Sequence, residues 1–318
     1  MRKPFERALE LAERGRGTTH PNPVVGAVVV AGEEVVGEGW HERAGGPHAE
    51  IVALDAAGER ARGATLYVTL EPCAHHGRTP PCADAIVAAG VDRVVVGSAD
   101  PNPKTDGQGF ARLRAAGIEV ERVEDELALR ARRQNEAWRT WVSERRPFVT
   151  YKAAVTVDGR VAVPGSRWVT GEESRRRVHE LRAASDAVAV GMGTVRADEP
   201  RLDARGVAAV RQPRRLGFGR GPLPAGSGLE LVDGPLPEEL ARLAEEGVQS
   251  LLLEGGPTLA TSFLQAGLVD KLLLFVAPTL SGSGAHWVGE LGEAVPLGRF
   301  AAERVGPDVL LTGYVHDP

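Results

Sequence analysis

The sequence predicts an α/β protein made of two domains. Its 318 residues correspond to about two domains of ordinary size. Short runs rich in Val, Leu and Ala, typical of buried strands, alternate with segments whose apolar residues recur at helical spacing. Strands separated by helices favour a sheet covered by helices. The polar stretch Ser143–Pro147 interrupts this alternation, and we place the boundary there, giving domains 1–146 and 147–318.

The first domain is predicted to start with a helix and to continue with alternating strands and helices. Phe5, Leu9 and Ala12 recur at helical spacing, and the Val/Ala run that follows them predicts a buried strand. Gly90 is a typical helix end. In chain order we expect a helix at 4–16, strands at 24–30 and 35–40, a helix at 48–61, a strand at 65–70, a helix at 82–89, a strand at 94–97, a helix at 109–116, a strand at 119–123 and a long helix at 124–142.

The second domain is predicted to restart the same alternation after the boundary. We expect a strand at 148–154, a turn at Asp158-Gly159, a helix at 171–184, a strand at 187–190, a helix at 238–246, a strand at 250–254, a helix at 258–266 and a strand at 271–277. Between them, Arg211–Pro237 is rich in Gly, Pro and Arg and shows little periodicity, so we expect it to be irregular.

Composition and charge argue against several classes of protein. A net charge of −5 is unlike that of a general nucleic-acid binder, so no nucleic acid is expected as a partner. The longest apolar runs fall far short of the roughly 20 residues of a membrane helix, and the charged start shows no secretory signal. Two cysteines are too few for a secreted disulfide scaffold, so we expect a cytoplasmic protein whose cysteines serve a metal or redox site.

The strongest motif combines His48-Ala49-Glu50 with Cys73 and Cys82, each cysteine preceded by proline. Thiolates and imidazole are zinc ligands, and a catalytic zinc site has three protein ligands and an open position. His48, Cys73 and Cys82 would form such a set. Glu50, two residues after His48, would act beside the metal as the group that moves a proton from water to a leaving amine. Singly, an H-x-E pattern can be a helix surface, and two cysteines can be core residues or a disulfide.

The pattern resembles the zinc nucleoside and nucleobase deaminases, whose signature is H-x-E followed by P-C-x-x-C. Here eight residues, Ala74–Pro81, separate the cysteines instead of two. The insert is rich in hydrogen-bond donors, which suits a larger, phosphorylated substrate. His75 and His76 in it are either substrate contacts or partners in loop hydrogen bonds.

A closer resemblance covers nearly the whole chain. The segments 19–26 (THPNPVVG), 45–50 (GGPHAE), 69–82 (TLEPCAHHGRTPPC) and 100–103 (DPNP) are similar to the bifunctional riboflavin-biosynthesis deaminase/reductases of bacteria. The resemblance implies a cytidine-deaminase-like first domain that hydrolytically deaminates a phosphoribosylated diaminopyrimidinone. It also implies a homodimer or larger homo-oligomer, and a pyrimidine contact for Asn22, which could otherwise be a turn residue between prolines.

The same resemblance implies a second domain similar to dihydrofolate reductase that uses NADPH to reduce the ribosyl to a ribityl chain. Its turn Glu254–Thr258 joins a strand to a helix, and free backbone N–H groups at such a helix start favour phosphate. By this resemblance the cofactor-binding residues are Ala154, Trp168, Thr194, Asp198, Gly256, Pro257, Thr258, Leu259, Ala260, Thr261 and Ser262. The substrate-binding residues are Ser166, Arg182, Leu202, Arg205 and Glu254.

Lys152 is one of four lysines in the chain and lies in the first strand of the second domain. We expect it to position or protonate the ring-opened ribosylamine together with Glu254, the alternative being a surface charge. One departure from the family's usual sequence argues against reductase activity in this domain. The strand after Arg211-Gln212-Pro213 lacks its usual apolar run and Asp-Ser end, and the segment after it is shorter than usual. The alternative function is therefore a deaminase with an inactive, structural reductase-like domain.

Overall fold

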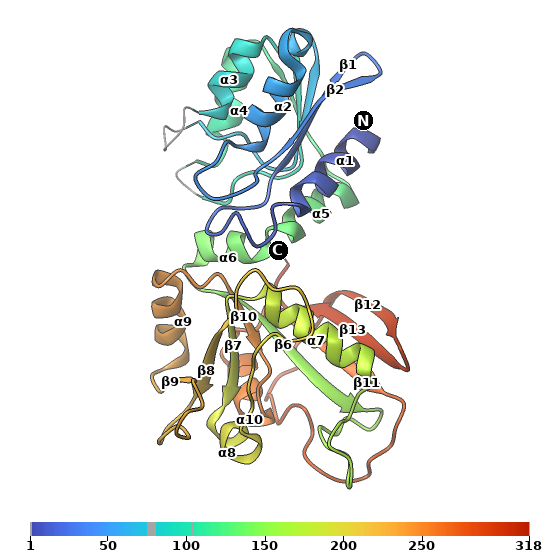
Figure 1. Cartoon of the computed structure of the whole chain (residues 1–318), viewed down its shortest axis with the longest axis vertical. Helices are drawn as coiled ribbons and strands as arrows, with labels where there is room; N and C mark the ends of the chain where they lie inside the picture. The colour runs from blue at the N-terminus through green and yellow to red at the C-terminus, as the bar shows by residue number, and fades with distance from the viewer. Residues whose placement is uncertain (1, 75–80, 103–104, 318) are drawn as a thin grey trace. The chain divides into compact units, whose positions relative to one another are not determined.

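The computed structural model describes residues 2–74, 81–102 and 105–317. The chain forms two compact units, one ending at Glu144 and the other spanning Arg145–Asp317 (Figure 1). Both units are α/β, which confirms the predicted fold class. Within the described ranges, no helix has the length and apolar character needed to cross a membrane.

A five-stranded mixed sheet forms the centre of the first unit, in the order β2-β1-β3-β4-β5. Strand β1 pairs antiparallel with both β2 and β3, whereas β3, β4 and β5 are parallel. The strands are β1 (Gly26–Ala31), β2 (Glu34–Trp40), β3 (Thr65–Val68), β4 (Arg93–Val96) and β5 (Glu119–Arg122).

Helices cover both faces of this sheet, because successive strand residues point to opposite sides. Val29 and Leu66 pack in a core with α2, α3 and α4, whereas Val28 and Tyr67 pack with α1 and α5. The unit is thus a three-layer sandwich, with α1 and α5 side by side (Figure 1). Its helices are α1 (Arg2–Glu13), α2 (Ala49–Ala57), the 3-10 helix η1 (Gly58–Ala61), α3 (Cys82–Ala89), α4 (Gln108–Ala115), α5 (Glu126–Gln134) and α6 (Glu136–Glu144).

The second unit contains an eight-stranded sheet in the order β12-β13-β11-β6-β10-β7-β8-β9. The strands from β11 to β9 are parallel, and β13 and β12 complete the other edge in antiparallel pairing. They are β6 (Phe148–Thr156), β7 (Ala187–Gly191), β8 (Arg214–Phe218), β9 (Glu230–Val232), β10 (Ser250–Leu253), β11 (Lys271–Ala277), β12 (Gly298–Val305) and β13 (Asp308–Tyr314).

Helices again cover both faces of this sheet. Leu240 of α9 and Phe263 of α10 pack on one face, and Val195 of α8 and Val178 of α7 pack on the other. The helices are α7 (Glu172–Ala184), α8 (Met192–Asp198), α9 (Leu236–Glu245) and α10 (Pro257–Gln265). The parallel strands β6, β7, β8 and β10 therefore all end at one edge, where ligands of α/β sheets bind.

Two predicted segments differ from the structure. The stretch 124–142 is two helices instead of one, because the side chain of Asn135 leaves the helix and binds both the N–H and the carbonyl of Val24, at 2.9 and 2.8 Å. The expectation that Arg211–Pro237 is irregular is wrong in part, since β8 and β9 form within it and Leu216 and Phe218 of β8 lie in the core.

The sequence also left helix α8 and strands β9, β12 and β13 unpredicted. Almost every residue of β12 is exposed, so the strand carries no alternation of apolar and polar residues to reveal it. Strand β8 has only three buried residues, too few for a recognisable apolar run.

Candidate active sites

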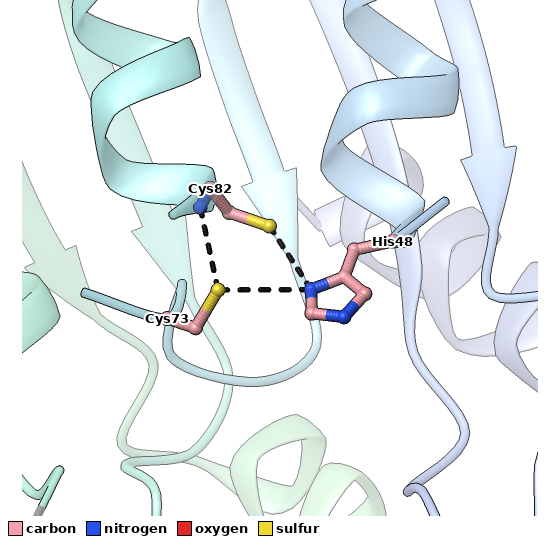
Figure 2. A group of neighbouring side chains, drawn as sticks. All are labelled: His48, Cys73 and Cys82. Carbon is pink, nitrogen blue, oxygen red and sulfur yellow. Dashed lines mark hydrogen bonds between the residues drawn. The ribbon is translucent and has the colours of Figure 1, made fainter. Parts of the chain in front are cut away.

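The three predicted metal ligands lie together in the first unit. The Nδ1 atom of His48 is 3.1 Å from the Sγ of Cys82 and 3.7 Å from the Sγ of Cys73. Figure 2 shows the three side chains pointing toward one another from different elements. All three ligand atoms lie within 4.8 Å of one another. The prediction of a His/Cys/Cys cluster is therefore matched by its geometry.

Local structure places each of these side chains. His48 directly precedes α2, Cys73 follows β3 by a short connection, and Cys82 is the first residue of α3. The backbone N–H of Cys82 donates to the sulfur of Cys73 at 3.3 Å. Because a helix N-terminus carries free N–H groups and a partial positive charge, it stabilises negative sulfur at this point.

The cluster fits a zinc ion. Bond lengths of about 2.0 to 2.3 Å in a tetrahedral site put ligand atoms about 3.5 to 3.8 Å apart, close to the separations around His48 Nδ1. Hydrogen bonds from Cys82 and from His48 lower the pKa of Cys73 to about 4, and the same contact with Cys73 raises the pKa of Cys82. The pair thus shares one negative charge, and a cation held between both sulfur atoms and the imidazole stabilises a second.

Glu50 is the second residue of α2, lies beside this cluster and is 4% exposed. Burial raises its pKa to about 7, against the opposing attraction of His48. A carboxyl group with this pKa both accepts and releases a proton near neutral pH, which is what a general acid–base group requires. The placement of Glu50 agrees with the role predicted for it.

A cavity of about 570 Å³ adjoins the cluster and is lined by Asn22, His41, His48, Glu50 and Cys73 among others. Asn22 Nδ2 is 3.1 Å from His41 Nε2, and His41 Nδ1 is 2.9 Å from the carbonyl of Pro47. Burial lowers the pKa of His41, so its ring is neutral. With its Nδ1–H donated to Pro47, the ring accepts at Nε2 from the Asn22 amide.

Sequence reasoning missed several residues of this cavity. Its wall includes Trp138 and Trp141 of α6 and the residue Glu71. Glu71 is 5% exposed and accepts backbone N–H groups of Asp100, Gly107, Gly109 and Phe110 at 2.9 to 3.4 Å. Glu71 stands in the T-L-E-P-C motif that precedes Cys73, but no local spacing links it to residues 100–110. His75 and His76 lie outside the described residues.

The second unit contains a cavity of about 860 Å³ at the edge where its parallel strands end. Ten of the predicted site residues line it: Lys152, Ala154, Trp168, Arg182, Thr194, Asp198, Arg205, Glu254, Gly256 and Pro257. They come from β6, α7, α8, α10 and connecting segments, including the turn that follows β10. The strand order of the sheet thus brings residues about a hundred positions apart in the sequence, such as Lys152 and Glu254, into one cavity.

Glu254 is the central charge of this cavity. Its carboxylate accepts Nε and Nη2 of Arg182, the latter at 2.9 Å, and Nζ of Lys152 lies 3.4 Å away. The three side chains are 7 to 13% exposed. Burial alone would raise the pKa of Glu254, but Lys152 and Arg182 outweigh it and lower the pKa to about 2. Lys152 is therefore a largely buried ion-pair partner of Glu254 and not a surface charge.

The turn after Glu254 has the features of a phosphate site. Gly255 adopts φ +24°, and the backbone at Gly256 lies so close to Thr194 that an added Cβ would be 2.9 Å from its hydroxyl oxygen. Helix α10 begins at Pro257 and directs its free N–H groups toward the turn. The donors present therefore fit a dinucleotide phosphate.

Seven predicted residues do not line the cavity: Ser166, Leu202, Thr258, Leu259, Ala260, Thr261 and Ser262. Leu202 and Ala260 are buried in the core, where their side chains face other apolar groups. The hydroxyl of Ser166 donates to the carbonyl of Trp168 at 2.8 Å. Ligand contacts by these residues remain predictions.

Comparison with known proteins agrees with both sites. Residues 2–98 match the cytidine and deoxycytidylate deaminase zinc-binding region, and residues 147–221 and 230–311 match the RibD C-terminal domain. Fold and sites thus define a bifunctional enzyme, a zinc-dependent deaminase joined to a reductase. The chain is 42% identical to the riboflavin biosynthesis protein RibD of Aquifex aeolicus, over 96% of this chain and 95% of that protein. It belongs to the RibD family of riboflavin biosynthesis proteins.

Further relatives support the same assignment. RibD of Escherichia coli is 40% identical over 96% of both chains. A solved structure of Acinetobacter baumannii RibD matches with a TM-score of 0.86 at 37% identity, covering 98% of each chain. A Thermotoga maritima structure, a diaminohydroxyphosphoribosylaminopyrimidine deaminase/5-amino-6-(5-phosphoribosylamino)uracil reductase, matches with a TM-score of 0.83 at 33% identity, covering 98% of this chain and 97% of that one. The prediction of a riboflavin-biosynthesis deaminase/reductase is confirmed, and it is favoured over the alternative of a deaminase alone.

Proposed function

We propose that the chain catalyses two successive reactions of riboflavin biosynthesis. The first is hydrolytic deamination of 2,5-diamino-6-(5-phosphoribosylamino)pyrimidin-4-one, and the second is NADPH-dependent reduction of the ribosyl group to a ribityl chain. The observation that carries this proposal is the His48/Cys73/Cys82 cluster with the buried Glu50 beside it, on a chain that also holds the Glu254 cavity. The Thermotoga maritima neighbour is named for both activities.

In the deaminase unit, His48, Cys73 and Cys82 would hold zinc, which supplies a Lewis acid that makes water nucleophilic at neutral pH. Glu50 takes the proton from that water and delivers it to the departing amino group, so that ammonia leaves. The Asn22 amide donates to His41 and therefore presents its oxygen as an acceptor for an N–H of the pyrimidine.

In the reductase unit, Thr194, Asp198 and the N-terminus of α10 would hold NADPH, which supplies the hydride. Arg182 and Arg205 would bind the substrate phosphate, since guanidinium groups pair with phosphate oxygens in a bidentate way. Lys152 would position or protonate the ring-opened ribosylamine, with Glu254 holding its ammonium group in place.

We further propose that the enzyme acts in the cytoplasm and assembles as a homodimer or larger homo-oligomer. A reducing compartment suits a zinc site built on two free thiols. The oligomeric state follows from the family resemblance alone, and light scattering of the purified chain tests it.

One reaction tests the central proposal. The zinc-loaded full chain is mixed with the diaminopyrimidinone phosphate and NADPH, and ammonia release and NADPH oxidation are followed together. Both signals are expected, with ammonia appearing first. Ammonia without NADPH oxidation would refute the reductase assignment, and a zinc-loaded chain that releases no ammonia would refute the deaminase assignment.

A further inference from the structure

The loop 199–206, here called the arginine loop, borders the reductase cavity in a strained conformation. Glu199 and Leu202 adopt positive φ angles of 42° and 53°, which non-glycine residues rarely do. Such conformations persist only where surrounding contacts enforce them, and they cluster at functional sites. The side chain of Leu202 is 2% exposed and anchors the loop in the core.

Side chains from other segments hold the backbone of this loop. The amide of Gln212 makes two hydrogen bonds to Ala204, accepting its N–H and donating to its carbonyl, each at 2.9 Å. On the other side of the loop, the carbonyl of Asp203 lies 3.1 Å from Nδ1 of His179 and accepts Nη1 of Arg182 at 3.2 Å. The loop is thus fixed from α7 and from the segment that leads into β8.

The loop in turn fixes a guanidinium group. The carboxylate of Asp203 pairs with Arg205 through Oδ1 and with Arg201 through Oδ2. Arg205 lines the reductase cavity together with Arg182. Because Arg205 is nearly half exposed, its long side chain gains a defined position from the Asp203 carboxylate and from the backbone of the loop that carries both residues.

We propose that Gln212 is a positioning residue that holds Arg205 in place to bind the phosphate of the reductase substrate. This inference rests on the phosphate contact proposed for Arg205. Gln212 holds the residue directly before Arg205, because its amide oxygen accepts the N–H of Ala204 and its amide nitrogen donates to the carbonyl of Ala204. The same two bonds give a function to the Arg-Gln-Pro segment, which directly precedes the strand that departs from the family pattern.

Steady-state kinetics of the full chain with the deaminated phosphoribosyl substrate test this role. Gln212→Ala loses both bonds, Gln212→Glu keeps the shape but repels the Ala204 carbonyl, and Val210→Ala, at a 70% exposed position in the same segment, is the control. Both Gln212 variants are expected to raise the reductase KM about tenfold, as for a lost contact to a charged group, with kcat near that of the unaltered chain. Ammonia release and NADPH affinity should not change.

Substrate lacking the phosphate separates positioning from general damage. The Gln212 variants should match the unaltered chain on this substrate, and Arg205→Ala should raise KM only when the phosphate is present. If Arg205→Ala raises KM while both Gln212 variants do not, the positioning role is refuted and the proposed function stands. If Arg205→Ala leaves KM unchanged, the phosphate contact itself is wrong. Equal losses with and without phosphate would also refute the role, because they indicate disturbed folding.

Discussion

The charge of Glu254 should contribute measurably to the stability of the reductase unit. Its carboxylate is 7% exposed and bound by Arg182 and Lys152, and its pKa falls from 4.5 to about 2. At about 1.4 kcal/mol per tenfold change in proton affinity, this corresponds to about 3 kcal/mol of folding free energy at neutral pH. We therefore expect Glu254→Gln to destabilise the reductase unit at pH 7 by about that amount.

The sign of the pH dependence follows from the lowered pKa. A carboxyl group whose folded-state pKa is depressed stabilises the fold above its unfolded pKa, and this contribution is lost as pH falls through the folded pKa. The deficit of the variant should therefore be full above about pH 5 and shrink to roughly half by pH 3.

Urea unfolding read by hydrogen–deuterium exchange mass spectrometry measures this deficit. Peptides from β6 and β10 report on the reductase unit, and peptides from the deaminase unit serve as an internal reference. Glu290→Gln, the same change at an exposed position, is the control. A deficit of the same size at pH 7 and pH 3 would refute the electrostatic reasoning and point to a lost packing contact instead.

Three further predictions follow from the geometry. Glu50→Gln should lower the rate of ammonia release by roughly 100-fold or more. The zinc content, measured by mass spectrometry, should stay stoichiometric. An unchanged rate of ammonia release would exclude Glu50 as the proton carrier. The Cys73→Ser variant should bind little zinc and release little ammonia. It should still oxidise NADPH when it is given substrate that has already been deaminated. Full retention of zinc would contradict the assignment of Cys73 as a ligand. Asp270→Ala should destabilise the reductase unit by about 3 kcal/mol. The 1% exposed carboxylate of Asp270 accepts two hydrogen bonds from Arg146 and one from the N–H of Val149. A denaturant midpoint within error of that of the unaltered chain would refute this prediction.

The deaminase centre could be predicted from sequence because its chemistry is concentrated in short motifs. His48 and Glu50 are two residues apart, and Cys73 and Cys82 flank one loop, so their residue types and spacing alone indicate zinc hydrolysis. The residues that shape the cavity could not be predicted in this way. His41 and Trp138 reach the site from separate elements, and only the folded sheet brings them to it.

Fewer features of the reductase unit could be predicted from its sequence, because its site is not concentrated in short motifs. Its polar contacts join residues far apart in the chain, such as Lys152 with Glu254 and Arg146 with Asp270. Strand β8 lacked the expected apolar run because its first two residues are arginines. Arg214 pairs with Glu230 and Glu246 at the edge of the sheet, and these partners explain how the strand tolerates the charge. A resemblance that placed Leu202 at the ligand could not show that its side chain points into the core.

Glu71 has a consequence for attempts to redesign the deaminase for other nucleobases. Glu71 lies two residues before Cys73, and its carboxylate accepts the backbone N–H groups of Asp100, Gly107, Gly109 and Phe110, of which Asp100 lines the cavity. The hydrogen bonds of Glu71 therefore hold both a part of the cavity wall and the segment that positions the metal ligand Cys73. A library that varies the length of 100–110 would shift the sulfur ligand along with the cavity wall, whereas substitutions that keep the backbone groups accepted by Glu71 leave the metal centre intact. Engineering of this pocket should proceed by side-chain exchange and not by loop grafting.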